Sequence, residues 1–493
     1  MGNALQGFGF QQTLTCLGPS RTGQCLGVSG VDPSSAFRAG VDGSTVPIPP
    51  LTASATPPLV PGAASFPGAN QPLANTTYQI DPQYRPGRNH QWDVTLQREM
   101  PGHALLEIGY IGRHANNIYN PLEVNGVPFM MTLNGQSYAQ AFDAIATQLK
   151  AGGGVTPQPF LEAALAGSSF CAAPNASCTA GVVSRYSGSF PIQRVTDVWN
   201  GIQPAFKFGP ATAATNQVQT MFYWASAGWA NYNAGFVSYR TRSYKGLTVD
   251  GNVTWAHSLD TRGLNQDFDT AASNSYNLHY DYGTSIFDRK VVLNLLSLYE
   301  LPFARNGHGA LSYIVKGWSI APIVNIASGL PLKVATGSGQ EFGQGGSTNS
   351  AGAILTAKDT FGNSVHSGVA GDAATQVGIN GDPARGGSGL NLFGNPVAVF
   401  NSFRPAMISL DTTSGAGGQL RGLSRWNVDL AVSRKFTLNE RWSATFSGQL
   451  FNAFNVVQLA DPSVSLQSPQ AFGVLGTQLN SPRIVQLGLH IDF

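Results

Sequence analysis

The four cysteines are the residues whose chemistry can be read most directly from spacing. Cys16 and Cys25 form one close pair and Cys171 and Cys178 a second, each in sequence rich in Gly, Ser, Ala and Pro. An even count at short intervals predicts two loop disulfides formed in an oxidising compartment. A metal site and unpaired thiols are the alternatives. The intervals differ from Cys-x2-Cys and no His lies nearby, so we predict disulfides and no metal centre.

An acidic run at 265–269, Asn-Gln-Asp-Phe-Asp, raises the question of calcium. An EF-hand loop needs Gly at its sixth position and Glu at its twelfth, where Thr270 and Tyr276 stand. We predict a solvated loop, with calcium held by loop oxygens as the alternative. The eight histidines are scattered, and no two lie at ligand spacing on one predicted strand face.

Motifs of nucleophilic, metalloprotease or phosphate-binding sites are absent from the sequence. The Gly-rich segments 337–346 and 378–389 lack dinucleotide-binding spacing and the strand-to-helix context it requires, so we predict outer loops. We therefore expect a protein that is not an enzyme and uses no cofactor.

Aromatic residues cluster after the longest connection of the chain, where stacking on sugar rings is one interpretation. Packing of that connection against the rim of the fold is the interpretation we favour. The residues are Trp199, Phe222, Tyr223, Trp224, Trp229 and Tyr232.

Composition restricts the class of protein. Charged residues make up 11% of the 493 residues, against roughly 25% in soluble domains, while hydrophobic residues make up 42%. A formal net charge of +2 without a dense Lys/Arg run predicts no nucleic-acid partner. The sequence contains no apolar run near the roughly 20 residues that a helix needs to cross a bilayer. A membrane protein of this sequence would therefore cross with strands.

Nine stretches of alternating apolar and polar residues predict nine strands between residues 89 and 493, among them hairpins at 89–112 and 231–258 and a strand at 317–334. An amphipathic pattern predicts one helix near Tyr138–Lys150. Short connections (100–102, 244–245, 304–316, 439–440) alternate with long ones (113–230, 259–288, 335–424, 456–482). Tight turns at one end and long loops at the other are typical of outer-membrane barrels. Residues 1–88 are rich in Gly and Pro, with no convincing strand, and we interpret them as an irregular extracellular segment.

Five tryptophans fall near the predicted strand ends. Trp92, Trp255 and Trp426 lie toward the long loops, and Trp318 and Trp442 toward the short turns. Two aromatic belts at the two interfaces are what a bilayer selects, so we predict that these residues mark the membrane boundaries. Ordinary core tryptophans of a soluble β protein are the alternative.

The final strand, which ends at Phe493, follows a long loop and would end in the periplasm. Counting back, the first strand also runs inward, which leaves an odd number of strands that starts from outside. Bacterial barrels have an even number of strands. The N-terminus also carries no signal-peptide pattern. We therefore expect the C-terminal part of a longer protein: an incomplete, all-β, antiparallel transmembrane barrel that forms an open curved sheet with long extracellular loops.

Several short motifs in order resemble the barrel of TonB-dependent outer-membrane receptors. The likeness is greatest to the Oar-like subgroup, which has a carboxypeptidase-regulatory-like N-terminal domain, and it covers about 89–493. The motifs are Asn89–Glu99, Leu106–Gly112, Phe287-Asp288-Arg289, Tyr299–Phe303, Gly317-Trp318-Ser319, Ala327–Pro331, Phe451-Asn452-Ala453-Phe454-Asn455 and the closing strand.

The resemblance implies a 22-stranded barrel around an N-terminal plug, with energy-coupled uptake of a metal chelate, vitamin or glycan. The TonB complex would act through a plug segment that this sequence lacks, and an unidentified ligand would bind at the extracellular loops. The resemblance also implies contact with outer-membrane lipid. Leu487, Leu489, Ile491 and Phe493 resemble the signal that the barrel-assembly machinery reads. A surface adhesin, a passive porin and a soluble secreted enzyme are the alternative classes.

Overall fold

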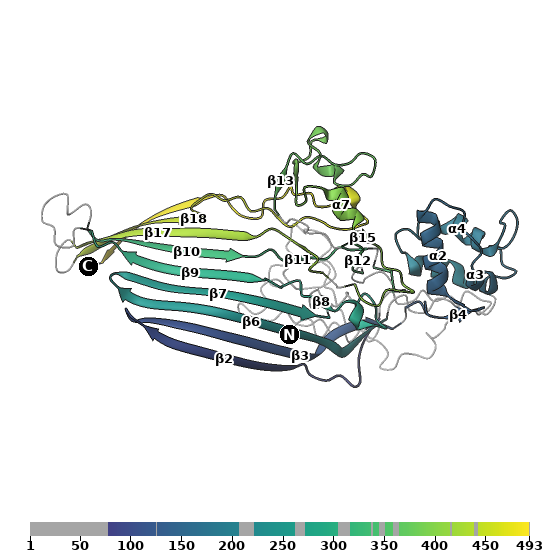
Figure 1. Ribbon diagram of the computed structural model, residues 1–493, viewed down its shortest axis with the longest axis horizontal. Coiled ribbons are helices and arrows are strands. Elements are labelled where there is room, and N and C mark those ends of the chain that lie inside the picture. Colours follow the sequence, from purple (N-terminus) through teal and green to yellow (C-terminus); the bar gives the residue numbers. More distant parts are fainter. Residues whose placement is uncertain are drawn as a thin grey trace, which may run out of the picture.

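Nine long strands form one antiparallel sheet in the computed structural model, which describes residues 77–124, 126–206, 221–261, 272–303, 316–336, 339–344, 351–357, 364–414, 417–437 and 442–492. The sheet order is β19-β18-β17-β10-β9-β7-β6-β3-β2, so each strand pairs with its neighbours along the chain. The sheet is curved and open (Figure 1). Its strands are β2 (Arg88–Met100), β3 (Ala104–Glu123), β6 (Met221–Tyr244), β7 (Leu247–Asp260), β9 (Val291–Glu300), β10 (Trp318–Ala327), β17 (Arg425–Thr437), β18 (Ser443–Phe451) and β19 (Ile484–Asp492).

Tight turns join β2 to β3 and β6 to β7 at one end of the sheet, which we call the turn end. Tyr244 pairs with Leu247 across a two-residue loop, in which Lys245 has φ +50° and Gly246 φ +85°. Two positive φ values in succession give the turn a twist that matches the flanking strands. The predicted hairpins at 89–112 and 231–258 are confirmed.

Side chains on one face of the sheet are apolar from edge to edge, and we call this the apolar face. Seven apolar residues, one on each of seven neighbouring strands, are successive register partners and form one row across this face. Leu96, in this row, is 73% exposed, and Leu487 on β19 is 68% exposed. The row is Leu96, Ile108, Val237, Val253, Leu293, Ile326 and Trp426.

The neighbouring row on the opposite, polar face carries hydrogen-bonding side chains across the same strands. Within this face Arg240 forms an ion pair with Asp250 at 3.0 Å. The alternation is less complete on β9 and β10, where Leu296, Leu298 and Ile323 also lie on the polar face and are exposed. The polar row is Gln97, Glu107, Ser238, Asn252, Asn294, Asn325 and Asn427.

Three strand boundaries and one additional strand differ from the sequence prediction. β3 continues as far as Glu123, and β6 begins as early as Met221, so both strands extend into the segment 113–230 that was predicted to be a loop. A short strand, β1 (Thr77–Ile80), lies in the segment predicted to be irregular and pairs in parallel with the start of β6. β10 ends at Ala327 rather than Val334, because the chain turns away and Pro331–Leu332 pairs with another loop strand.

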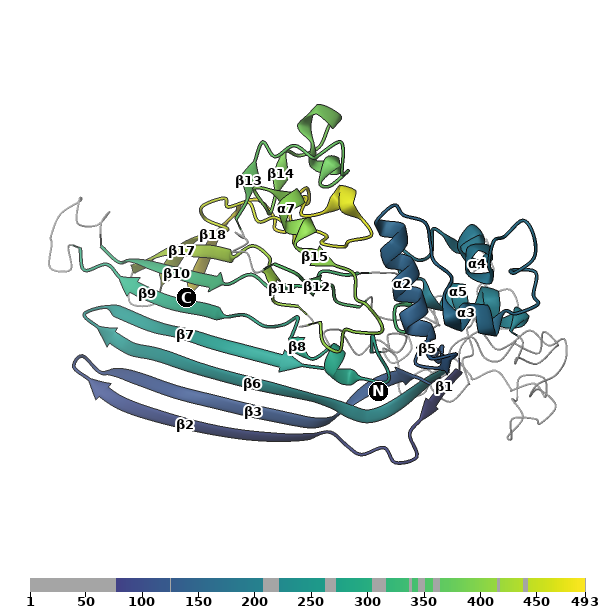
Figure 2. The same ribbon diagram turned by 45° about the vertical axis from the view of Figure 1, so that its right-hand side comes forward.

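The long loops gather at the other end of the sheet, the loop end, and form two units with buried cores (Figure 2). The first core is built mainly from 127–206, and its central helix, α2 (Tyr138–Lys150), has the predicted bounds. Ser137 and Gln140 start α2 with a reciprocal capping box. The second core joins residues of 332–420 to Val464, Phe472 and Leu475.

The remaining elements belong to this loop region. The helices are α3 (Pro159–Ala164), α4 (Cys178–Tyr186), α5 (Val195–Ile202) and α7 (Pro396–Asn401), with single 3-10 turns η3 (Gln203–Ala205), η4 (Leu278–Tyr280), η5 (Ile379–Gly381), η6 (Pro383–Arg385) and η7 (Pro469–Ala471). The short strands are β4 (Thr132–Leu133), β5 (Gln136–Ser137), β8 (Gly283–Thr284), β11 (Pro331–Leu332), β12 (Ile354–Leu355), β13 (His366–Ser367), β14 (Leu390–Asn391), β15 (Phe403–Arg404) and β16 (Leu420–Arg421).

Among the residues that the structure describes, no helix is both long enough and apolar enough to cross a membrane.

Candidate binding region at the loop end of the sheet

Buried polar contacts fasten the first loop unit to the loop between β10 and β17. The Asp143 carboxylate of α2 accepts hydrogen bonds from the Ser409 hydroxyl (2.6 Å), the Ser409 amide (2.8 Å) and the Ile408 amide (3.2 Å). The Gln193 side-chain amide donates to the Ala406 carbonyl. Burial raises the pKa of Asp143 to about 6, although the hydrogen bonds from Ser409 and Ile408 act in the opposite direction.

A bidentate ion pair shapes the segment that receives Asp143. Arg404 binds both carboxylate oxygens of Asp411, at 2.6 and 2.8 Å, and this contact raises the pKa of Arg404. Asp411 also accepts from the Met407 amide at 2.6 Å. The segment therefore carries its own charge compensation and presents amide donors to the neighbouring unit.

A second buried ion pair anchors the loops to the top of the sheet. The Asp288 side chain is fully buried and binds the guanidinium of Arg421. The same carboxylate accepts from the Ser258 amide at 2.6 Å and lies 3.3 Å from Nδ1 of His257. Arg421 also donates to the Gly329 carbonyl. One carboxylate thus connects β7, the segment before β9 and the loop strand β16.

A cleft of about 420 Å³ lies at the loop end of β2, β3, β6 and β7, and we call it the edge pocket. Two arginines, Arg88 and Arg113, line it together with Tyr232 and Ser258. Arg113 donates to the Gln91 side chain at 3.0 Å. The rest of the lining is Gly87, Asn89, Ala115, Asn116, Ile118, Ala230 and Asn231, so the described residues that line it include no Asp or Glu.

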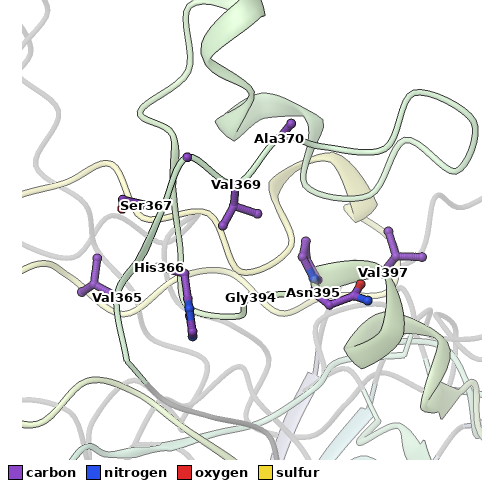
Figure 3. Close-up of a pocket in the computed structure, with 10 residues that line it drawn as sticks. Val365, His366, Ser367, Val369, Ala370, Gly394, Asn395 and Val397 are labelled. Carbon is purple, nitrogen blue, oxygen red and sulfur yellow. The ribbon is translucent and has the colours of Figure 1, made fainter.

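Another cleft, of about 650 Å³, lies within the second loop unit (Figure 3). Residues 365–370 and 394–397 line it, and the His366 ring stands beside Gly394. His366 lies 3.3 Å from the Ser364 hydroxyl. Its lining contains no Asp, Glu, Lys or Arg, and His366 is its one titratable side chain.

The predicted belt residues lie at the ends of the sheet. Trp92 packs its indole over Gly112 on the apolar face, where a Cβ at Gly112 would overlap the ring. Trp255, Trp426 and Trp442 are exposed, Trp426 lies near Phe454, and Trp318 begins β10 beside Arg434. These positions leave the membrane-boundary role a prediction.

The other predicted site residues divide between described and undescribed parts of the chain. Leu487, Leu489 and Ile491 alternate on the exposed apolar face of β19, whereas Phe493 lies outside the described residues. Cys171 and Cys178 are joined by a disulfide that closes the segment before α4. Cys16, Cys25 and the acidic run at 265–269 lie outside the described residues.

The aromatic cluster is largely internal. Trp199, Phe222 and Trp224 are buried, and Trp199 packs edge-on against Tyr138 and Phe206. Trp199 belongs to the core of the first loop unit, whereas Phe222 and Trp224 form a separate cluster with Tyr119. Tyr232 differs, because it lines the edge pocket.

Sequence inspection missed a pair of histidines that face each other across two strands. His90 pairs directly with His114, and their ring centroids lie 6.4 Å apart. Nδ1 of His114 lies 2.8 Å from the Asn231 amide oxygen. The turn around Pro101-Gly102 sets this register, so counting outward from the turn could have found the pair. In the described part of the chain, no group of three or more His, Cys, Asp or Glu side chains is placed to hold a metal ion.

An open sheet with one apolar exposed face, one polar face and loops folded at one end defines a protein of the membrane β-barrel class. The sequence matches the outer membrane beta barrel domain family over residues 26–486, and the chain belongs to that family. No curated protein matches the sequence of this chain.

Solved structures with similarity to the chain include the outer membrane transporter YddB from Escherichia coli (TM-score 0.36, 9% identity, 86% of this chain and 34% of that one). A second is the ferric-catecholate import receptor Fiu from E. coli K12 in its closed form (TM-score 0.30, 7% identity, 83% of this chain and 28% of that one). A third is the pyoverdine outer membrane receptor FpvA from Pseudomonas aeruginosa PAO1 bound to pyoverdine (TM-score 0.30, 9% identity, 83% of this chain and 30% of that one). The chain spans about a third of the length of these proteins.

Proposed function

We propose that this chain is the C-terminal barrel portion of a TonB-dependent outer-membrane receptor that takes up a scarce ligand without catalysing a reaction. The observation that carries the proposal is the division of faces across the sheet, apolar on one side and polar on the other except at parts of β9 and β10, with the described loop cores at one end. A wall of this kind separates lipid from an aqueous interior. The ligand class is a metal chelate, a vitamin or a glycan.

In this proposal the loop end is extracellular and the turn end periplasmic. The apolar face contacts outer-membrane lipid, with Trp92, Trp255 and Trp426 at the outer interface and Trp318 and Trp442 at the inner one. Leu487, Leu489, Ile491 and Phe493 are the signal that the barrel-assembly machinery recognises. Contact with the TonB complex is made by a plug segment of the complete receptor, and the loops capture the ligand.

Two features support ligand capture by the loops. Both loop units have buried apolar cores, and inter-loop contacts such as Asp143 with Ser409 join segments 266 residues apart. Loops that fold in this way provide a defined surface rather than a flexible fringe. The edge pocket adds polar side chains at the entrance to the interior face.

The test is uptake by the complete protein in a Gram-negative host stripped of its own receptors. Radiolabelled ferric chelates, cobalamin and malto-oligosaccharides are supplied to cells with and without a functional TonB protein. Accumulation of one probe only in TonB-positive cells is the expected result. Equal accumulation in both strains would indicate a passive porin. Surface adhesion without accumulation of any probe would indicate an adhesin and overturn the proposal.

A further inference from the structure

We propose that His90 on β2 and His114 on β3 bind one divalent transition-metal ion, such as Zn²⁺, between the two strands, with water completing its coordination. The bound ion fastens β2, the last strand in the described sheet order, to its neighbour β3. The inference goes beyond the proposed function and does not depend on it.

The two imidazole rings share one face of the sheet. His90 and His114 are direct register partners, and the pairing of Leu96 with Ile108 in the apolar row belongs to the same unbroken register. Side chains an even number of residues apart on a strand point to the same side, so both rings lie on the apolar face. Directly opposite residues have Cβ atoms about 4.5–5.5 Å apart, a separation that two histidines can span to share an ion.

The distance between the rings is close to that of two imidazoles on one ion. Their centroids lie 6.4 Å apart, and their planes differ by 22°. With Zn–N bonds of about 2.1 Å and tetrahedral angles, two imidazoles bound to one ion have centroids about 5 Å apart. The rings must therefore approach each other by about 1 Å. The His90 side chain is exposed and can rotate about its single bonds to make that movement.

Asn231 on β6 prepares His114 as a ligand. Its amide oxygen lies 2.8 Å from Nδ1 of His114, and its amide nitrogen donates to the Tyr282 hydroxyl at 2.9 Å. An amide oxygen can only accept, so Nδ1 of His114 carries the proton and Nε2 keeps its lone pair. Histidines that bind metals commonly have such a hydrogen bond on the other ring nitrogen, because it fixes the tautomer and the orientation of the ring.

His90 supplies the second nitrogen. Within the described part of the chain its ring makes no hydrogen bond or ion pair, so a ring nitrogen is accessible to an ion. Arg88 lies two residues earlier on the same face, but its side chain is exposed, where salt screens its repulsion of a cation. No third His, Cys, Asp or Glu of the described residues joins the pair, so we expect weaker binding than at a structural site with four protein ligands.

The test titrates the full chain, prepared in neutral detergent without a histidine tag, with Zn²⁺ by calorimetry. Pulsed electron paramagnetic resonance of the Cu²⁺-loaded protein counts the imidazoles bound to the ion. The ligand variants are His90→Gln and His114→Gln, and Asn231→Ala tests the positioning role of its hydrogen bond. His490→Gln is the matched control, because His490 is exposed on β19, at the opposite edge of the described sheet. Heat-modifiable gel mobility and circular dichroism show which variants are folded.

We expect Zn²⁺ affinity to fall by about tenfold or more in each ligand variant and by about tenfold in Asn231→Ala, with no change in His490→Gln. The Cu²⁺ spectrum should show two bound imidazoles in the wild type and one in His90→Gln. Zn²⁺ should also slow hydrogen exchange of the β2 amides in the wild type but not in His90→Gln. A wild-type chain without saturable Zn²⁺ binding would overturn the metal site, and so would undiminished affinity in folded His90→Gln.

Discussion

The Phe451–Asn455 motif offers the sharpest test of how sequence determines structure here, through replacement of Asn452. This side chain is 7% exposed, and it donates to the carbonyls of Val456 (3.0 Å) and Ser481 (3.1 Å). Its oxygen accepts from the Val456 amide at 2.8 Å. Asn452 also has φ +50°, a left-handed conformation that Asn tolerates better than Ala. It therefore closes the loop between β18 and β19 in two ways.

The magnitude follows from these contacts. In Asn452→Ala the Val456 amide loses its hydrogen-bond acceptor, which destabilises the loop by about 2 kcal/mol. The positive φ at an Ala destabilises it by about 1 kcal/mol more, so the free energy of local opening falls by about 3 kcal/mol. Asn452→Gly keeps the backbone conformation and isolates the hydrogen-bond part, about 2 kcal/mol. Hydrogen exchange of the Val456 amide reports local opening, and 3 kcal/mol corresponds to roughly 100-fold faster exchange.

The control is Asn294→Ala, an exposed position in the middle of β9 on the polar face. It should leave exchange at Val456 unchanged. Equal exchange rates in wild type and Asn452→Ala would refute the loop-closing role. Equal effects of Gly and Ala would remove the contribution of φ from the argument.

Three further predictions address the loops and the sheet. Burial raises the Asp143 pKa from 3.8 to about 6, so the native state holds this proton more tightly. The resulting stabilisation of the folded state, about 3 kcal/mol, is fully present below pH 4 and is lost as the pH rises through 6. Hydrogen exchange of the Ser409 amide between pH 4 and 7.5 should show this pH dependence, and Asp143→Asn should abolish it. Arg421→Ala removes the guanidinium that pairs with the buried Asp288 carboxylate, and it should lower the free energy of unfolding in urea by about 3–5 kcal/mol. Adding Asp288→Asn to this variant should restore part of that stability. Gly109→Val would overlap the Phe236 ring and should destabilise by about 1–3 kcal/mol, whereas a neutral result would show that the ring moves freely.

Local pattern was enough to predict the sheet. Period-two alternation located all nine long strands, and the turn sequences located the hairpins, because both signals depend on residues close in sequence. The helix Tyr138–Lys150 was predictable for the same reason, since its cap residues lie three apart. The loop-closing role of Asn452 within the recognised motif follows from its contacts in the structure.

Contacts between residues far apart in the sequence could not be predicted from local pattern. Asp143 meets Ser409 across 266 residues, and Arg421 meets Asp288 across 133, with no periodic signal to relate them. β1 escaped notice because a four-residue parallel strand depends on its partner β6 rather than on its own pattern. The edge pocket depends on the register of four strands at once, so no local pattern in the sequence could indicate it.

The central claim is that one face of this sheet meets lipid and the other meets water. Spin labels at Asn252 and Val253, adjacent on β7, test it directly in a background whose native cysteines are replaced by serine. In bilayers, the label at Val253 should relax with oxygen and be shielded from a water-soluble nickel chelate, and the label at Asn252 should show the reverse. Equal accessibility of both sites to the nickel chelate would contradict the claim.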